Sequence, residues 1–350
     1  MHTLILGFGF ILLAAVSGGV FGLQYRIMRK YTVENSAMLT MLVATIVVPL
    51  IAVWFVLPGW TKAITEVGWE RNLLVFILGF GWGMGAITFA YGINILGMAL
   101  AVSILQGINV AVGAGIPLAR HWSEVPADAR AVTIVGLLLL LLGAALAGMA
   151  GRMREREHRA ALEAEPDTQQ SSIVVHRATG VVFLIGLGSC LASGLLSACA
   201  NLGYEFADPL ERAMGADLTW RATLIRWMPM YWGGITAMVI VFGGTMIKQG
   251  TWRNYFMPDT GRDCFVSSSM GVVHFLAQIP YGVGAYYLGA LGTTVGWGAN
   301  IGMALVVAVL IGFVRGEWSG VSKASVRILQ VGIGVLLAAF VVLAYANSLV

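Results

Sequence analysis

Uncharged polar side chains interrupt long apolar stretches of the chain, and some recur at a fixed spacing. Gln106 and Asn109 lie three residues apart in one stretch, and Trp297 and Asn300 have the same spacing in another. Residues three apart lie on one face of an α-helix, so each pair points in one direction. Amides supply hydrogen-bond donors and acceptors without a net charge. Such pairs are suited to bind the hydroxyl groups of a neutral solute.

Further candidates for this binding role occur in other apolar stretches. Trp82 lies within the sequence GWGMG and Trp297 lies between two glycines, so each indole has space for a flat apolar partner such as a sugar ring. The candidate substrate-binding residues are Gln24, Tyr25, Trp82, Gln106, Asn109, Asn201, His274, Gln278, Trp297 and Asn300. In the competing interpretation, each amide bonds to a neighbouring helix and each indole packs against small residues. The candidate residues are distributed over several helices, which favours a cavity that binds a solute over isolated helix contacts.

Titratable groups are rare in the apolar stretches, which limits the groups that can carry a proton. His274 is the mid-stretch histidine, and imidazole titrates near neutral pH. Glu205 and Glu34 lie at the ends of their stretches, so the proton-coupling candidates are His274, Glu205 and Glu34. No Asp or Glu lies in mid-stretch, which disfavours a site for an organic cation. Arg226 is expected to extend its guanidinium to the membrane interface, and the alternative is that it pairs with Glu205 or contacts an anion.

The stretches that carry these residues are long enough to cross a membrane. Of the 350 residues, 58% are hydrophobic and 11% are charged, whereas a soluble domain has about 25% charged residues. This composition excludes a disordered chain, a nucleic-acid-binding protein and an ordinary cytosolic enzyme. A helix of about 20 apolar residues spans the bilayer core. The sequence predicts ten such spans, at 4–24, 36–57, 72–92, 98–118, 131–150, 179–203, 222–247, 265–288, 294–314 and 325–349.

The loops predict the orientation of these spans. Most Lys and Arg residues follow odd-numbered spans, which places those loops in the cytoplasm and both termini in the periplasm of a bacterial inner membrane. The first span lacks a basic leading segment and a clear cleavage site, so it is interpreted as a retained helix and not a signal peptide. Trp227 and Trp232 are expected in the interfacial aromatic belt.

A charged segment divides the spans into two sets of five. Residues 151–177 mix charges of both signs and are interpreted as a cytoplasmic linker with a short helix. Because five is odd, residues 178–350 enter the membrane from the opposite side to residues 1–150, which predicts two inverted five-helix repeats. The dipeptide Leu-Gly at residues 96–97 and again at 288–289 supports this repeat, as do the prolines at 49 and 229.

Catalytic and metal-binding motifs are not found in the sequence. It contains no H-E-x-x-H, G-x-S-x-G or Walker glycine motif, so we expect no enzyme activity, no cofactor and no metal. Three cysteines cannot form a disulfide framework, and Cys190 and Cys199 are interpreted as buried small hydrophobic residues. An integral-membrane enzyme for lipid-linked substrates and a non-transporting receptor are the alternatives from other classes.

At these residues the chain resembles the L-rhamnose–proton symporter family, within the drug/metabolite transporter superfamily of ten-helix carriers. The resemblance lies in Tyr25-Arg26, Lys30 and Glu34, in residues 81–85 with the later Leu-Gly-Met at 96–98, in Asn201, Gln278 and Trp297, and in Gly-Glu-Trp at 316–318. It implies proton-driven uptake of a deoxy-hexose. It also implies that Trp82, Asn201, Gln278 and Trp297 bind the sugar.

The sequence thus predicts a secondary transporter that takes up a small neutral polyhydroxylated solute, L-rhamnose or a related monosaccharide, with protons. Two membrane-embedded repeats are expected to rock about a central uncharged cavity and expose it alternately to each side. The alternative within transport is a metabolite or drug exporter of the same superfamily. The partners expected are the solute, the proton and membrane lipid, with no nucleic acid.

Overall fold

The computed structural model describes residues 2–20, 28–164 and 180–350. These residues form helices joined by short turns, and none of them lies in a β-strand. Nine segments of the described chain are long and apolar enough to cross a membrane, and one of these, Gly261–Val314, contains two long helices, α12 and α13. The predicted all-α, polytopic membrane architecture is therefore confirmed.

The first half of the described chain contains α1 (His2–Val20), α2 (Val33–Leu42), α3 (Val48–Val56), α4 (Trp60–Val67), α5 (Trp69–Leu96), α6 (Met98–Arg120) and α7 (Ala127–Ala164). A π-helical turn at Val43–Val47 joins α2 to α3, so these two helices form one span. Pro49 lies at the start of α3, directly after this turn, and has no backbone N–H to donate to the helix.

The second half contains α8 (Val181–Phe206), α9 (Asp208–Ala213), α10 (Trp227–Met238), α11 (Gly244–Gln249), α12 (Gly261–Leu288), α13 (Gly292–Val314) and α14 (Lys323–Ser348). A 3₁₀ segment, Ala216–Arg226, leads into α10, and a π-helical turn at Val239–Gly243 joins α10 to α11. The helices that match the predicted spans begin and end within a few residues of them, except that α7 is longer and α10 begins later than its predicted span.

Two glycines make the tight reversals that the sequence predicts after α5 and α12. Gly97 has a φ of +83° and Gly289 has a φ of +65°, in the left-handed region that L side chains rarely adopt. The chain passes from α5 into α6 through Gly97 alone, and from α12 into α13 through one 3₁₀ turn. Each reversal keeps two long helices adjacent in the bundle.

Glycines also let α5 approach α10 closely. A Cβ at Gly79 would lie 1.9 Å from the carbonyl oxygen of Met230, and one at Gly233 would lie 1.9 Å from that of Phe76. Small residues allow this contact between backbones, which stabilises helix pairs in lipid through van der Waals packing. The same contacts hold Trp82 of α5 against α10.

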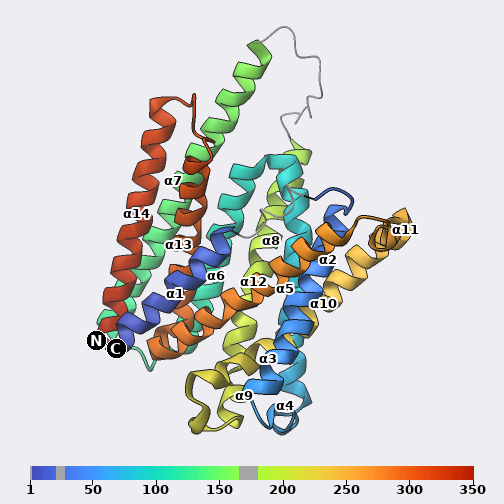
Figure 1. The fold of residues 1–350 in the computed structure, drawn as a ribbon. Helices are drawn as coiled ribbons and strands as arrows, with labels where there is room; N and C mark the ends of the chain where they lie inside the picture. Colours follow the sequence, from blue (N-terminus) through green and yellow to red (C-terminus); the bar gives the residue numbers. More distant parts are fainter. Residues whose placement is uncertain (1, 21–27, 165–179) are drawn as a thin grey trace.

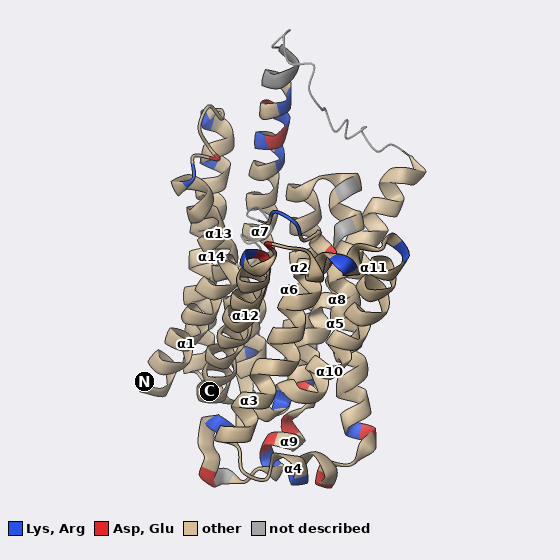
Figure 2. Cartoon of the chain, turned by 45° about the vertical axis from the view of Figure 1, so that its right-hand side comes forward, with Lys and Arg blue, Asp and Glu red and all other residues tan. Residues whose placement is uncertain are grey.

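The helices form a bundle with two distinct ends, and both chain termini lie at one of them (Figure 1). We call this end the termini side and the opposite end the linker side. Charged residues lie mainly toward the two ends, and few of them lie in the middle of the bundle (Figure 2). On the linker side, residues 151–164 continue α7 as a helix, although the predicted span ends at residue 150.

Candidate functional site

Asn201 of α8 is fully buried and lies where three other helices meet. Its amide nitrogen donates to the carbonyl oxygens of Gly113 in α6 at 2.7 Å and Thr293 in α13 at 2.8 Å. Its amide oxygen accepts a hydrogen bond from the hydroxyl of Tyr281 in α12. All these partners belong to the protein, so Asn201 joins α6, α8, α12 and α13 in this conformation.

Gln106, Asn109 and Trp297 form a second polar group beside Asn201. The amide nitrogen of Asn109 donates to the side-chain oxygen of Gln106 at 3.2 Å, and the indole N–H of Trp297 donates to Asn109 at 3.3 Å. Trp297 also makes an edge contact with Tyr281, with ring centroids 5.5 Å apart. The structure therefore brings Gln106, Asn109, Asn201 and Trp297 into one network. Its remaining link is Tyr281, which the sequence analysis did not select.

Trp82 and His274 form a stacked pair between α5 and α12. Their ring centroids are 6.2 Å apart and the ring planes differ by 16°. The indole also packs on Gly234, because a Cβ there would lie 2.7 Å from the ring. Both Trp82 and His274 are half-buried. The predicted glycine-lined space around Trp82 is thus partly occupied by α10.

Buried aromatic rings connect the Trp82 pair to the Asn201 network. Tyr231 lies 6.1 Å from Trp82 and stacks on Trp227 at 5.5 Å. Trp227 in turn contacts Tyr204 at 4.6 Å and Tyr281 at 5.9 Å. Trp227 is only 1% exposed, so its predicted place in the interfacial belt is wrong. Its ring lies inside the bundle, in contact with Tyr204 of α8 and Tyr281 of α12.

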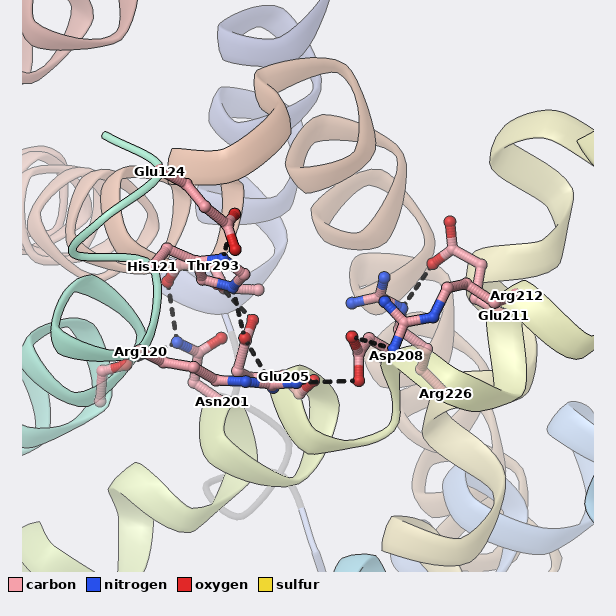
Figure 3. Close-up of polar contacts among 11 residues, drawn as sticks. Arg120, His121, Glu124, Asn201, Glu205, Asp208, Glu211, Arg212, Arg226 and Thr293 are labelled. Atoms are coloured by element: carbon pink, nitrogen blue, oxygen red, sulfur yellow. Dashed lines mark hydrogen bonds and ion pairs between the residues drawn. The ribbon is translucent and has the colours of Figure 1, made fainter. Parts of the chain in front are cut away.

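Glu205 ends the network near the termini side and is almost completely buried, at 3% exposure. Its carboxylate accepts hydrogen bonds from the guanidinium of Arg120 at 2.8 Å and from the hydroxyl of Thr293 at 2.7 Å. It also pairs with Nε2 of His121 at 2.8 Å (Figure 3). These partners come from the end of α6 and the start of α13. Three polar contacts compensate the cost of removing this carboxylate from water.

Ion pairs extend this cluster to α9 and the 3₁₀ segment (Figure 3). Asp208 pairs with Arg120 at 3.2 Å and with Arg212 at 2.8 Å. Arg226 pairs with Glu211 at 2.5 Å, and its guanidinium lies 4.9 Å from the ring centroid of Tyr204. The expectation that Arg226 extends to the interface is therefore wrong. Its side chain is held inside the cluster by a carboxylate and an aromatic face.

A cavity of about 260 Å³ lies within this cluster of charges. Its walls include Glu205, Thr293, Arg226 and residues of α9, together with Tyr286 of α12. The volume is slightly below the roughly 300–1,000 Å³ that is common for small-molecule sites. The sequence predicts an uncharged central chamber, whereas this cavity lies toward the termini side and has charged walls.

His121 lies just beyond the end of α6, between two carboxylates. Its Nδ1 lies 2.8 Å from Glu124, and its Nε2 contacts Glu205. Burial lowers the pKa of the imidazole, but the hydrogen bonds with Glu124 and Glu205 raise it by more, so that the pKa lies above the ordinary value of 6.5. The protonated imidazole is the form that these contacts favour.

The other candidates lie apart from these contacts or outside the described residues. Gln278 is half-buried one turn after His274 on α12. The side-chain oxygen of Asn300 is buried and has no hydrogen-bond partner among the residues described. Glu34 lies in the first turn of α2, a helix that begins toward the linker side, whereas Glu205 lies at the end of α8 (Figure 1). Gln24 and Tyr25 fall outside the described residues.

The network also contains four residues that were not among the predicted candidates, Arg120, His121, Thr293 and Tyr281. A signal was present for the first two, because an Arg-His pair directly ends an apolar span and Glu205 ends another. Tyr281 follows Pro280 within a span and carries a polar hydroxyl. In the described part of the chain, no group of three or more His, Cys, Asp or Glu side chains is arranged to hold a metal ion.

Comparison with known proteins identifies the family. The model of the L-rhamnose-proton symport protein (RhaT) family matches residues 1–349. The chain belongs to this family. The L-rhamnose-proton symporter of Escherichia coli strain K12 / DH10B is 21% identical to it over 359 residues, covering 97% of this chain and 96% of the relative. The symporters of strains K12 / MC4100 / BW2952 and 55989 / EAEC give the same values. The resemblance inferred from the residues is confirmed.

Proposed function

We propose that the protein takes up L-rhamnose or a related monosaccharide together with protons, across a bacterial inner membrane. The observation that carries this proposal is the family match over residues 1–349, whose relatives are named L-rhamnose-proton symporters. The buried, largely uncharged network around Asn201 supports it, because amides and indoles together suit the hydroxyl groups and apolar faces of a sugar.

Alternating access would come from ten spans in two inverted repeats, residues 1–150 and 178–350, with residues 151–177 between them. The helix contacts support this arrangement. In this arrangement the five spans of the first half are α1, α2–α3, α5, α6 and α7, and they correspond in order to α8, α10–α11, α12, α13 and α14. Each helix contact between the halves should then have a counterpart in which the two halves are interchanged. The α5–α8 contact corresponds to α12–α1, and α6–α8 corresponds to α13–α1. The π-helical turns of the second and seventh spans also correspond.

The sugar site would lie between these repeats, with the Trp82–His274 pair and the Gln106–Asn109–Trp297 group on either side of the buried aromatic rings. Gln278 and Asn300 would contribute further amide groups, and Gln24 and Tyr25 would contribute from the end of the first span. Asn201 already has protein partners for its amide, so it would bind sugar only after one of these contacts is exchanged.

Transport by the purified protein in liposomes tests the proposal directly. With an acidic exterior, radiolabelled L-rhamnose should accumulate above its external concentration, and a protonophore should abolish the accumulation. A panel of monosaccharides measures the specificity. Accumulation driven by an acidic interior would instead favour the exporter. If the protein transports no monosaccharide, the proposal is contradicted.

The orientation has its own test, because the chain has a natural reporter. Cys264 is exposed in the first turn of α12 on the linker side, whereas Cys190 is buried. With periplasmic termini, a membrane-impermeant maleimide should label Cys264 in inverted vesicles and not in intact spheroplasts. The variant Cys264→Ser is the control, because any label that it retains must be at another cysteine, such as the partly buried Cys199. Labelling of Cys264 in intact spheroplasts would instead show that the linker side faces the periplasm and the termini face the cytoplasm.

A further inference from the structure

The contacts of Glu205 connect helix ends that lie far apart in the sequence. Glu205 is in the last turn of α8, Arg120 and His121 are at the end of α6, and Thr293 is at the start of α13. An ionised carboxylate at 3% exposure is stable only while its charge is paired and its oxygens accept hydrogen bonds. The ionised form of Glu205 therefore holds these three helix ends together on the termini side.

The charges around Glu205 balance when His121 is protonated. The cationic groups are Arg120, His121, Arg212 and Arg226, and the acidic groups are Glu124, Glu205, Asp208 and Glu211. All of these groups except Arg120 and Glu124 line the cavity, together with the phenols of Tyr204 and Tyr286. Asp208 contacts Arg120 independently of Glu205, so Arg120 keeps a partner if Glu205 becomes neutral.

Thr293 connects Glu205 to the polar network inside the bundle. Its hydroxyl donates to Glu205 at 2.7 Å, and its carbonyl oxygen accepts from Asn201 at 2.8 Å. Asn201 also precedes Glu205 by one turn on α8. A displacement of α13 from α8 would therefore break contacts at Glu205 and Asn201 together. Glu205 also lines the cavity, whose volume of about 260 Å³ is large enough to hold water beside the carboxylate.

We propose that Glu205 binds the transported proton, and that Glu205, Arg120, His121 and Thr293 form a latch that keeps the termini side closed while Glu205 is ionised. This inference rests on the proposed function. A proton from water in the cavity forms an O–H bond with the carboxylate, and the neutral acid no longer holds Arg120 and His121 by charge. Arg120 then remains with Asp208, and the ends of α6 and α13 can separate from α8 to admit sugar. With sugar bound, the neutral form also allows these helix ends to close again. After the sugar site opens to the linker side, the proton leaves to water on that side, and the restored ion pairs hold the termini side closed.

Glu205→Gln separates this role from a structural one, because glutamine has the same size and cannot titrate. In liposomes, the variant should retain sugar counterflow within about twofold of wild type, since exchange needs no net proton movement, while accumulation driven by a pH gradient falls about tenfold or more. Sugar binding should also lose its pH dependence. Glu66→Gln is the matched control, because Glu66 is half-exposed on α4, outside the cluster, and should behave as wild type.

The outcomes distinguish the latch from the function. If wild type accumulates sugar and Glu205→Gln accumulates it equally well, the latch is refuted and the proposed function stands. If folded Glu205→Gln loses counterflow as well as accumulation, Glu205 has a general structural role and the latch is also refuted. If wild type transports no monosaccharide, the proposed function itself fails.

A second variant covers the case in which Glu205→Gln does not fold. His121→Gln removes one cationic group from the carboxylate and keeps a hydrogen-bonding side chain. Because a nearby opposite charge opposes protonation of a carboxylate, the pH of half-maximal uptake should rise by about one unit. An unchanged pH profile would refute the latch.

Discussion

Tyr281 donates its phenolic hydrogen to the side-chain oxygen of Asn201, and this contact joins α12 to α8 in the buried part of the bundle. Both side chains are almost completely buried. The same asparagine bonds to α6 and α13 through its amide nitrogen. One side chain therefore fixes the relative positions of four helices. One of them, α6, belongs to the first half of the chain, and the other three belong to the second half.

Replacement of Asn201 by alanine should reduce stability as well as sugar binding. The substitution leaves the carbonyl oxygens of Gly113 and Thr293 and the hydroxyl of Tyr281 without their partner. We expect a loss of about 1–3 kcal/mol in the free energy of unfolding, measured by unfolding in detergent. Tyr281→Phe removes a single hydrogen bond and should cost about 0.6 kcal/mol. Lost sugar binding with unchanged stability would show that the amide serves the sugar and not the helices.

The stacked pair of Trp82 and His274 predicts a defined effect on affinity. If the indole forms one wall of the sugar site, Trp82→Ala removes an aromatic contact worth about 0.5–1.5 kcal/mol. The KM for sugar should then rise up to about tenfold, measured from initial uptake rates in liposomes. Trp54 is 70% exposed on α3, so Trp54→Ala is the control and should leave the KM unchanged. Equal KM values for the two variants would exclude Trp82 from the site.

Close packing of α5 on α10 predicts which glycines tolerate a methyl group. Gly79→Ala places a Cβ against the backbone of Met230 and should destabilise the protein by about 1–3 kcal/mol. Gly188 of α8 has nothing within 4 Å of the equivalent position, so Gly188→Ala should leave stability unchanged or slightly higher. Thermal unfolding of the two variants in the same detergent measures the difference. Equal melting temperatures would contradict the close helix contact.

The raised pKa of His121 predicts how stability depends on pH. The imidazolium gains contacts with Glu124 and Glu205 in the folded protein, so its stabilisation is fully present below the unfolded pKa, near 6.5. It is lost as the pH rises through the higher folded pKa. The melting temperature should therefore fall as the pH rises above about 6.5. His121→Gln should flatten this part of the profile, and an identical slope in the variant would assign the effect to another group.

The sequence by itself determined the helical membrane architecture. Lipid offers no partners for the backbone, so long apolar stretches must form helices that satisfy their own hydrogen bonds. The reversals at Gly97 and Gly289 were also predictable, because a helix ends locally at a glycine that can adopt positive φ. The three-residue spacing of Gln106 and Asn109 likewise placed two side chains close enough to hydrogen-bond.

Only the tertiary structure decided which helix ends meet. Glu205 pairs with Arg120 across 85 positions of the sequence, and neither residue contains information about the other. The inward direction of Trp227, the ion pair of Arg226 and the protein partners of Asn201 depend on the rotation of each helix about its axis. That rotation follows from packing against neighbouring helices, including the glycine contacts of α5 and α10, because an almost uniformly apolar helix has no strong internal preference for the face that it buries.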